Sequence, residues 1–348
     1  MIRRSRPSNI RHLVGVRHHL AATLAAFFSL GLLAAGCGGN ETTGSAGDYD
    51  GAPVELTEAA ADPSKDAFPV PDGRSLEDLA ALAQTGLEIA PATQLFTPGI
   101  NRMAFGLIDS QGGAAYAPTA VYVGRKPDSV AKGPYLAPTD SLVTEPSFQS
   151  RNAATEDDPF ASVYEAEVDL PGEGNWAVLV LSDHGGDKLL GATTQLKVEA
   201  NDRVPSVGDS APPSETDTVA KAGDITDIDT RVPPDSMHET ALTDVLGKRP
   251  VALLFATPAL CQSRVCGPVT DIAEQLKSEY GDEIEFIHQE VYVDNDPAKG
   301  IRQPLVDYGL RSEPWLFTIG ADGVIAARLE GSFGQGAFED AVQKAIDQ

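Results

Sequence analysis

The chain has 348 residues, which is enough for about two domains, and its formal net charge is −25. The first 36 residues contain five arginines and no acidic residue. The rest of the chain therefore has 21 of the 26 basic residues against all 51 acidic ones, a net charge of −30. This charge argues against nucleic-acid backbones and anionic lipid surfaces as direct partners.

The N-terminus has the features of a secretory signal. A basic stretch is followed by an apolar run from Leu20 to Leu33, and small residues precede Cys37. The run is too short for a comfortable membrane span of about 20 residues. The five residues that end at Cys37, Leu-Ala-Ala-Gly-Cys, resemble the lipobox of bacterial lipoproteins. The resemblance implies a signal peptide over residues 1–36 and a lipid on Cys37 that anchors the protein to the extracytoplasmic face of the bacterial cell membrane.

Residues 37–74 are rich in Gly, Thr, Ala and acidic residues, a composition that predicts a disordered tether. A short helix is expected over residues 75–85. Ser75 is suited to cap this helix, leucines recur in it at helical spacing, and Gly86 can end it.

Residues 75–200 as a whole predict an all-β domain. Apolar and acidic residues alternate from Tyr164 to Leu170, and a Pro-Gly turn then leads into an apolar strand from Trp176 to Leu181. Further strands are expected over residues 103–108, 119–123 and 192–198. Short strands with regular turns favour a β-sandwich. The segment resembles the small immunoglobulin-like domains found beside redox or metal-handling modules, and we expect it to act as a spacer rather than a binding surface.

Residues 201–237 are rich in Pro, Asp, Ser and Thr, which predicts a linker. An α/β domain is expected over residues 238–348. Val251–Phe255 is a continuous apolar run, typical of a central strand covered on both faces. The remaining pattern predicts a helix over 269–280, a strand over 284–293, a short helix over 301–308, strands over 315–319 and 324–329, and a final helix over 338–346.

This β-α-β-α-β-β-α order, together with the Phe-Ala-Thr at 255–257, the Cys-Gly-Pro at 266–268 and the segment 308–314, resembles the thioredoxin-like fold, a central mixed sheet flanked by helices. The likeness begins near Val204 and is closest to exported, membrane-anchored thiol–disulfide oxidoreductases and their peroxiredoxin relatives. It implies that Pro314 follows a cis peptide bond and that Pro314 and Trp315 help to position a substrate peptide.

If lipid occupies Cys37, only Cys261 and Cys266 remain as thiols, and outside the cytoplasm such a pair is expected to be oxidised, transiently or permanently. The family pattern is Cys-Gly-Pro-Cys, but Val269 follows Gly-Pro here. Two alignments to the family pattern are possible. Counting from the apolar strand places Cys261 at the position of the nucleophile, whereas matching the Gly-Pro pair places Cys266 there. We favour Cys266, because Pro268 at the first helical position would leave this thiol at the helix cap, where backbone N–H groups and the helix dipole stabilise a thiolate.

Other positions also depart from the family. Leu254 occupies the place of a buried carboxylate, and Glu313 precedes the proline where the family generally has an apolar residue or Thr. His184, His238 and His288 are far apart in the sequence, so a Cys/His zinc cluster has no local spacing to support it. We therefore expect no metal ligands and no cofactor.

The preferred interpretation is a monomeric thiol–disulfide exchange protein, in which Cys266 attacks disulfides of exported proteins and Cys261 resolves the mixed disulfide. Two alternatives stay open. One is a non-catalytic thioredoxin-like binding module stapled by a Cys261–Cys266 disulfide. The other is a copper-delivery protein that uses both cysteines and a histidine, for which His288 is a weak candidate because it lies on a strand.

The lipobox generates the first prediction. Mature wild-type protein is expected to sediment with membranes, whereas the Cys37→Ser variant, which has no acceptor for the lipid, is expected in the soluble fraction. Fractionation of cells followed by immunoblotting measures this. Unchanged membrane retention of the variant would rule out the lipid on Cys37 and leave an ordinary signal peptide that contains a cysteine.

Overall fold

The computed structural model describes residues 54–158, 161–201 and 203–348. The expected signal peptide and Cys37 lie outside the described residues. Within the described ranges, no helix is both long and apolar enough to cross a membrane.

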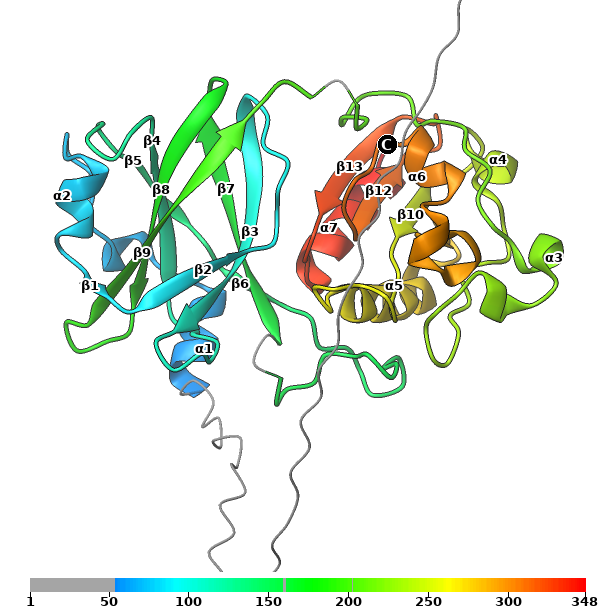
Figure 1. Ribbon diagram of the computed structural model, residues 1–348, viewed down its shortest axis with the longest axis horizontal. Helices are drawn as coiled ribbons and strands as arrows, with labels where there is room; N and C mark the ends of the chain where they lie inside the picture. The colour runs from blue at the N-terminus through cyan, green and yellow to red at the C-terminus, as the bar shows by residue number, and fades with distance from the viewer. Residues whose placement is uncertain (1–53, 159–160, 202) are drawn as a thin grey trace, which may run out of the picture. The chain divides into compact units, whose positions relative to one another are not determined.

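The first half of the described chain forms two β-sheets (Figure 1). One sheet has the strand order β1 (Gln84–Thr85), β9 (Leu189–Val198), β8 (Gly174–Asp183), β4 (Thr119–Gly124) and β5 (Lys132–Leu136). The other has the order β2 (Leu87–Pro91), β3 (Gly99–Asp109), β7 (Ser162–Leu170) and β6 (Thr139–Ser141). All pairings are antiparallel except that of β1 with β9.

The two sheets share one hydrophobic core. Phe105 and Val168 enter it from one sheet, and Val121 and Val178 enter it from the other. Along β7 the apolar side chains expected to face inward are buried, as the alternating pattern predicts. This part of the chain therefore consists mainly of two sheets on one core, while the predicted immunoglobulin-like sandwich stays a prediction.

Structure begins earlier than the expected tether allows. Helix α1 (Val54–Ala61) and a short 3₁₀ turn at Lys65–Ala67 lie within residues 37–74, and Phe68 is buried. Aromatic and aliphatic side chains in the second half of this segment provide apolar surface to bury, so it folds in spite of its polar composition. Helix α2 (Leu76–Ala80) is capped by Ser75 as predicted, but it ends five residues sooner.

The C-terminal sheet has the strand order β11 (Glu285–Gln289), β10 (Val251–Phe255), β12 (Trp315–Ile319) and β13 (Ile325–Glu330). The central strand β10 pairs in parallel with β11 and antiparallel with β12, and β12 and β13 form a hairpin. Helix α5 (Cys266–Tyr280) joins β10 to β11, α6 (Gln303–Asp307) precedes β12, and α7 (Gln335–Ile346) ends the chain. The predicted β-α-β-α-β-β-α order is confirmed, and with it the mixed sheet of the thioredoxin-like fold.

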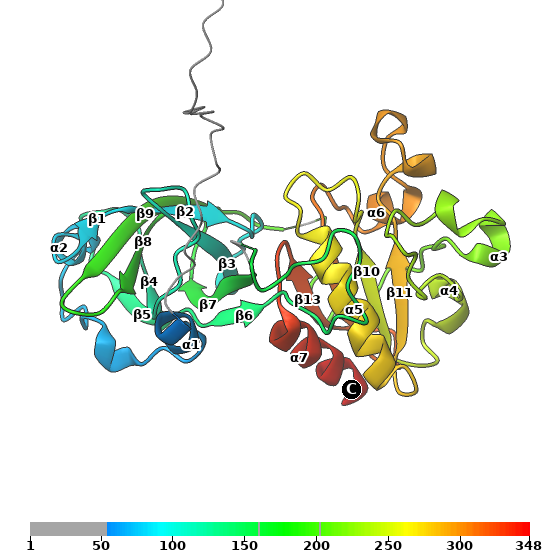
Figure 2. The same ribbon diagram turned by 90° about the horizontal axis from the view of Figure 1, so that it is seen from below.

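Both faces of this sheet are covered. Ala252 and Leu254 of β10 pack with side chains of α5 and α7, while Leu253 and Phe255 pack on the opposite face with Leu305 of α6. Figure 2 shows α5 and α7 side by side beside the sheet. Because β10 is buried on both faces and paired on both edges, the loop that follows it starts from a rigid point.

Residues 201–237 do not behave as the predicted linker. Side chains of this segment that are buried in the structure include Val204, Ala211, Thr216, Asp229, Arg231 and Asp235. The segment contains helix α3 (Val219–Ala222) and precedes α4 (Leu242–Val245). Proline and aspartate are frequent here because they form turns and cap backbone N–H groups, not because the segment is solvated.

Gly331 generates a prediction about stability. Its φ is +74°, and a Cβ placed there would lie 1.6 Å from the carbonyl oxygen of Ala92. Gly331→Ala is expected to lower the free energy of unfolding by more than about 1 kcal/mol, because it adds a backbone clash to the strain of a positive φ. Gly300→Ala is the control, since Gly300 has a φ of +86° and open space around it. Urea unfolding compares the two, and an equal loss in both variants would contradict the clash.

Candidate functional site

The cysteine loop, residues 256–265, carries Cys261, folds around Thr257 and leads to Cys266, the other cysteine of the described chain. The backbone N–H groups of Leu260 and Cys261 donate to the Thr257 carbonyl, at 3.2 and 3.1 Å. The N–H of Arg264, whose φ is +63°, then donates to the Cys261 carbonyl at 3.3 Å. This turn directs the chain back toward the start of α5, where Cys266 is the first helical residue.

Cys266 is completely buried. Its side chain lies in the core between the sheet and α5, and its carbonyl accepts a hydrogen bond from the Thr270 hydroxyl at 2.8 Å. Burial raises the pKa of the Cys266 thiol well above its usual value, and the hydrogen bond that this thiol makes to Cys261 raises it further. Cys266 is therefore protonated at neutral pH.

Cys261 is only partly buried, and several donors surround its sulfur. The Cys266 thiol hydrogen bonds to it, the Ser263 hydroxyl lies 3.2 Å away, and the backbone N–H groups of Cys266 and Ser263 contribute. Led by the bond from Cys266, these donors lower the pKa of the Cys261 thiol to about 6. Cys261 is therefore mainly a thiolate at pH 7.

The predicted low pKa for Cys266 is wrong, and the reason is one of position. The sequence pattern placed Pro268 at the first helical position, but Val265 is the N-cap and Pro268 is the third helical residue. Cys266 thus points into the core from inside the first turn. The backbone N–H of Cys266, which has no partner within the helix, instead donates to the Cys261 sulfur in front of the turn. Both thiols are free in the structure, and the expected disulfide stays a prediction.

The segment before β12 brings an acidic group to this pair. The Glu313–Pro314 peptide bond is cis, as the resemblance predicts. Glu313 is half-buried, and burial followed by the negative charge of Cys261 raises the pKa of its carboxyl. Burial, and then the charges of Glu313 and of both cysteines, raise the pKa of Tyr292. A carboxyl and a phenol therefore interact electrostatically with the thiols.

Trp315 does not fit its predicted role in positioning a substrate. Its side chain is only 2% exposed, its indole N–H donates to the Ser312 hydroxyl at 3.0 Å, and its ring stacks on Phe317. The bulky apolar ring beside the proline is used to fill the core.

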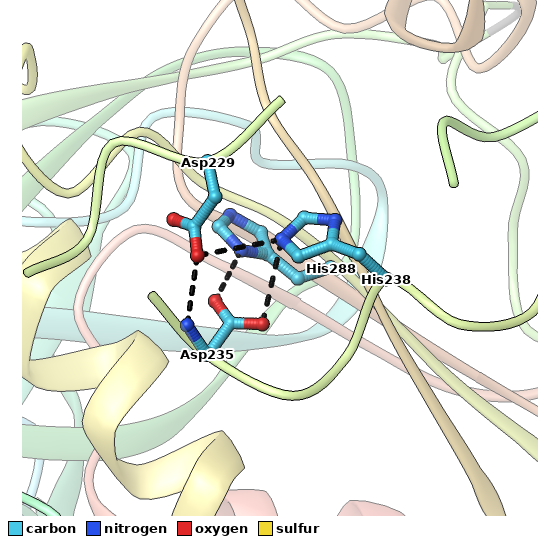
Figure 3. Close-up of side chains that lie close together, drawn as sticks. All are labelled: Asp229, Asp235, His238 and His288. Carbon is cyan, nitrogen blue, oxygen red and sulfur yellow. Dashed lines mark hydrogen bonds and ion pairs between the residues drawn. The ribbon is translucent and has the colours of Figure 1, made fainter. Parts of the chain in front are cut away.

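Behind the cysteine loop lies a buried cluster that the sequence analysis missed. Asp229, Asp235, His238 and His288 are all buried, with one ligand-type atom of each within 4.8 Å of the others (Figure 3). The Asp-x₂-His spacing of Asp235 and His238 was the available signal. His288 is 50 residues from His238 in the sequence, and the two come together because the backbone N–H of His288 donates to the Met237 carbonyl at 3.1 Å.

The cluster is electrostatically balanced within itself. Burial disfavours a charged His288, but the Asp235 carboxylate outweighs burial and raises the pKa of His288 to about 10. Burial also opposes a charged His238, and the carboxylates of Asp229 and Asp235 again outweigh it and raise its pKa. The two histidines in turn hold the pKa of Asp235 well below its usual range in spite of burial. Two carboxylates thus favour the charged form of both imidazoles.

No family model and no curated protein matches the sequence. Among solved structures, a Chlorobium tepidum protein assigned as thiol:disulfide interchange protein DsbE is 17% identical, with 40% of this chain and 98% of that chain covered and a TM-score of 0.30. A thioredoxin-family thiol:disulfide interchange protein from Chlorobium tepidum TLS is 14% identical, with coverages of 42% and 99% and a TM-score of 0.27. At these values neither likeness bears on the chemistry of this chain.

The cysteine pair generates a prediction about pH. In reduced protein the rate of alkylation by iodoacetamide is expected to rise with a midpoint near pH 6, because the Cys261 thiolate is the reacting species. Cys266→Ala removes the leading donor, so the midpoint should move up toward the free value of about 8.5. Mass spectrometry of the alkylated peptide measures both. A wild-type midpoint at or above the free value would contradict the hydrogen-bonded thiolate.

Proposed function

We propose that this protein is a thiol–disulfide oxidoreductase that exchanges disulfides with exported proteins from a lipid anchor on the extracytoplasmic face of the membrane. Cys261 is the attacking thiolate and Cys266 is the resolving thiol, which reverses the order favoured by the sequence. The proposal of a lipid anchor is supported by the lipobox alone. The proposal of disulfide exchange is supported by the properties of the two cysteines.

The asymmetry of the two thiols is the observation that supports this function. The thiolate is the nucleophile in disulfide exchange, and it must reach a sulfur of another protein. Cys261 meets both conditions, because it is partly exposed and has a lowered pKa. Cys266 meets neither, since it is completely buried and protonated, but it is hydrogen-bonded to the sulfur that it would have to attack.

The reaction then has two steps. The Cys261 thiolate attacks one sulfur of a substrate disulfide, a mixed disulfide forms, and the second substrate sulfur leaves as a thiolate that takes a proton from water. Cys266 next loses its proton and attacks the Cys261 sulfur, which releases the first substrate sulfur as a thiolate. The substrate gains two electrons and the cysteine pair becomes a disulfide. With a dithiol substrate the same steps run in reverse.

Glu313 is placed to assist the second step. A buried thiol such as Cys266 needs an acceptor for its proton, and the family's buried carboxylate is replaced by Leu254. The Glu313 carboxyl interacts with both thiols and has a raised pKa, so it is a better base than an ordinary glutamate. It therefore takes over the task of a carboxylate on the central strand.

Trapping of the mixed disulfide tests the proposal. Cys266→Ala stops the reaction after the first step, so this variant is expected to accumulate covalent complexes with exported proteins. Non-reducing electrophoresis reveals these complexes, and a reductant should dissolve them. The matched variant Cys261→Ala lacks the nucleophile and should form none.

Each other outcome has its own meaning. Complexes in Cys261→Ala alone would return the nucleophile to Cys266. If neither variant forms complexes, and the wild-type disulfide resists reduction in the folded protein, the pair is a structural staple and the domain is a binding module.

A further inference from the structure

The buried cluster behind the cysteine loop has the geometry of a metal site. Nε2 of His238 lies 3.4 Å from an Asp235 oxygen and 3.7 Å from an Asp229 oxygen, and Nδ1 of His288 lies 2.7 Å from the second Asp235 oxygen. Ligands at the corners of a zinc tetrahedron are about 3.3 Å apart, given Zn–N and Zn–O bonds of about 2.0 Å. Figure 3 shows the four side chains converging, and small shifts would place all four around one ion.

His238 is the second and independent observation. Its side chain is 1% exposed, yet among the described residues neither ring nitrogen makes a hydrogen bond, and Nε2 has only the two ion-pair contacts at 3.4 and 3.7 Å. A buried polar group without a partner costs about 1–3 kcal/mol, so native structures rarely retain one. Its ring points toward the two carboxylates and lies 4.9 Å from the ring of His288. A metal ion between these groups would give Nε2 one short bond in place of two long ion-pair contacts.

The surroundings also orient the ligands as the second shell of a metal site does. Nε2 of His288 lies 3.1 Å from the Ala256 carbonyl oxygen, which leaves Nδ1 for a metal. Backbone N–H groups fix both carboxylates. Those of Arg231 and Asp235 donate to Asp229 at 2.7 and 2.8 Å, and that of Met237 donates to Asp235 at 2.9 Å.

The donor set selects the class of ion. Two imidazoles and two carboxylates suit zinc and neighbouring transition metals, whereas magnesium and calcium prefer oxygen donors alone. The two carboxylates balance a divalent charge when both imidazoles are neutral. All four side chains are buried, so no ligand position opens to solvent, which is typical of a structural rather than a catalytic site.

We propose that Asp229, Asp235, His238 and His288 bind one divalent transition-metal ion, with Zn²⁺ as the best fit. The ion fastens the segment 229–238 to β11 and, through the Ala256 carbonyl, supports the start of the cysteine loop. The alternative is a metal-free cluster, in which protonated imidazoles and carboxylates hold the same groups together as ion pairs.

Metal binding by the full chain, purified in detergent and stripped with a chelator, distinguishes the two. Cys261→Ala and Cys266→Ala are introduced together, so that neither thiol of the pair can bind the metal and the result is independent of the redox proposal. Titration with ZnCl₂ in a calorimeter, followed by elemental analysis after desalting, is expected to give one Zn²⁺ per chain. MgCl₂ is expected to give none.

His238→Phe, which keeps a ring in the buried space, should abolish the one-to-one binding, and Asp235→Asn should weaken it by more than about 100-fold, as the loss of a direct ligand exceeds that of an outer partner. His184→Ala, in the β8–β9 turn, is the control and should retain one Zn²⁺.

The thermal unfolding midpoint of the unsubstituted site provides a second measurement that does not depend on the folding of a variant. It should rise with ZnCl₂ and not with MgCl₂. Folded, stripped protein that binds no stoichiometric Zn²⁺ would overturn the proposal in favour of the ion-pair cluster, as would binding by His238→Phe equal to that of the parent.

Discussion

The burial of β10 on both faces and both edges is the constraint on which the functional region depends. The C-terminal end of β10 is fixed by β11 on one side and β12 on the other. The cysteine loop leaves from this end, the cis Pro314 arrives beside it, and the Ala256 carbonyl just beyond the strand receives the ring of His288. Groups from three distant parts of the sequence therefore meet at this end of β10.

There, the burial of each thiol determines its role in the proposed exchange reaction. A helix N-terminus stabilises a charge in front of it, but it does not compensate for the removal of a thiolate from water. Cys266 is inside the first turn and buried, so desolvation prevails there. Cys261 is in front of the turn and partly exposed, so the donors prevail. The two sulfurs are close neighbours with opposite properties, which makes the pair suitable for sequential attack.

Sequence patterns predicted the elements well where one physical cause dominates. The apolar run of β10, the helical spacing of α5 and the alternation in β7 each follow from burial on known faces. The patterns failed where composition and position compete. Proline and aspartate in residues 201–237 resemble a linker but form buried turns, and Gly-Pro did not reveal how far Cys266 lies inside the helix. The Asp/His cluster was not predictable locally, because a long-range backbone contact between Met237 and β11 brings His288 to Asp235.

The donors around Cys261 also bear on the direction of electron flow. A hydrogen bond to a thiolate exists only while the sulfur carries its charge, and it is lost when that sulfur enters a disulfide. The same contacts that lower the pKa of Cys261 therefore stabilise the dithiol state relative to the disulfide state. Each tenfold gain of this kind raises the reduction potential of a two-electron couple by about 30 mV. In the proposed exchange, these contacts favour transfer of the disulfide to an incoming dithiol.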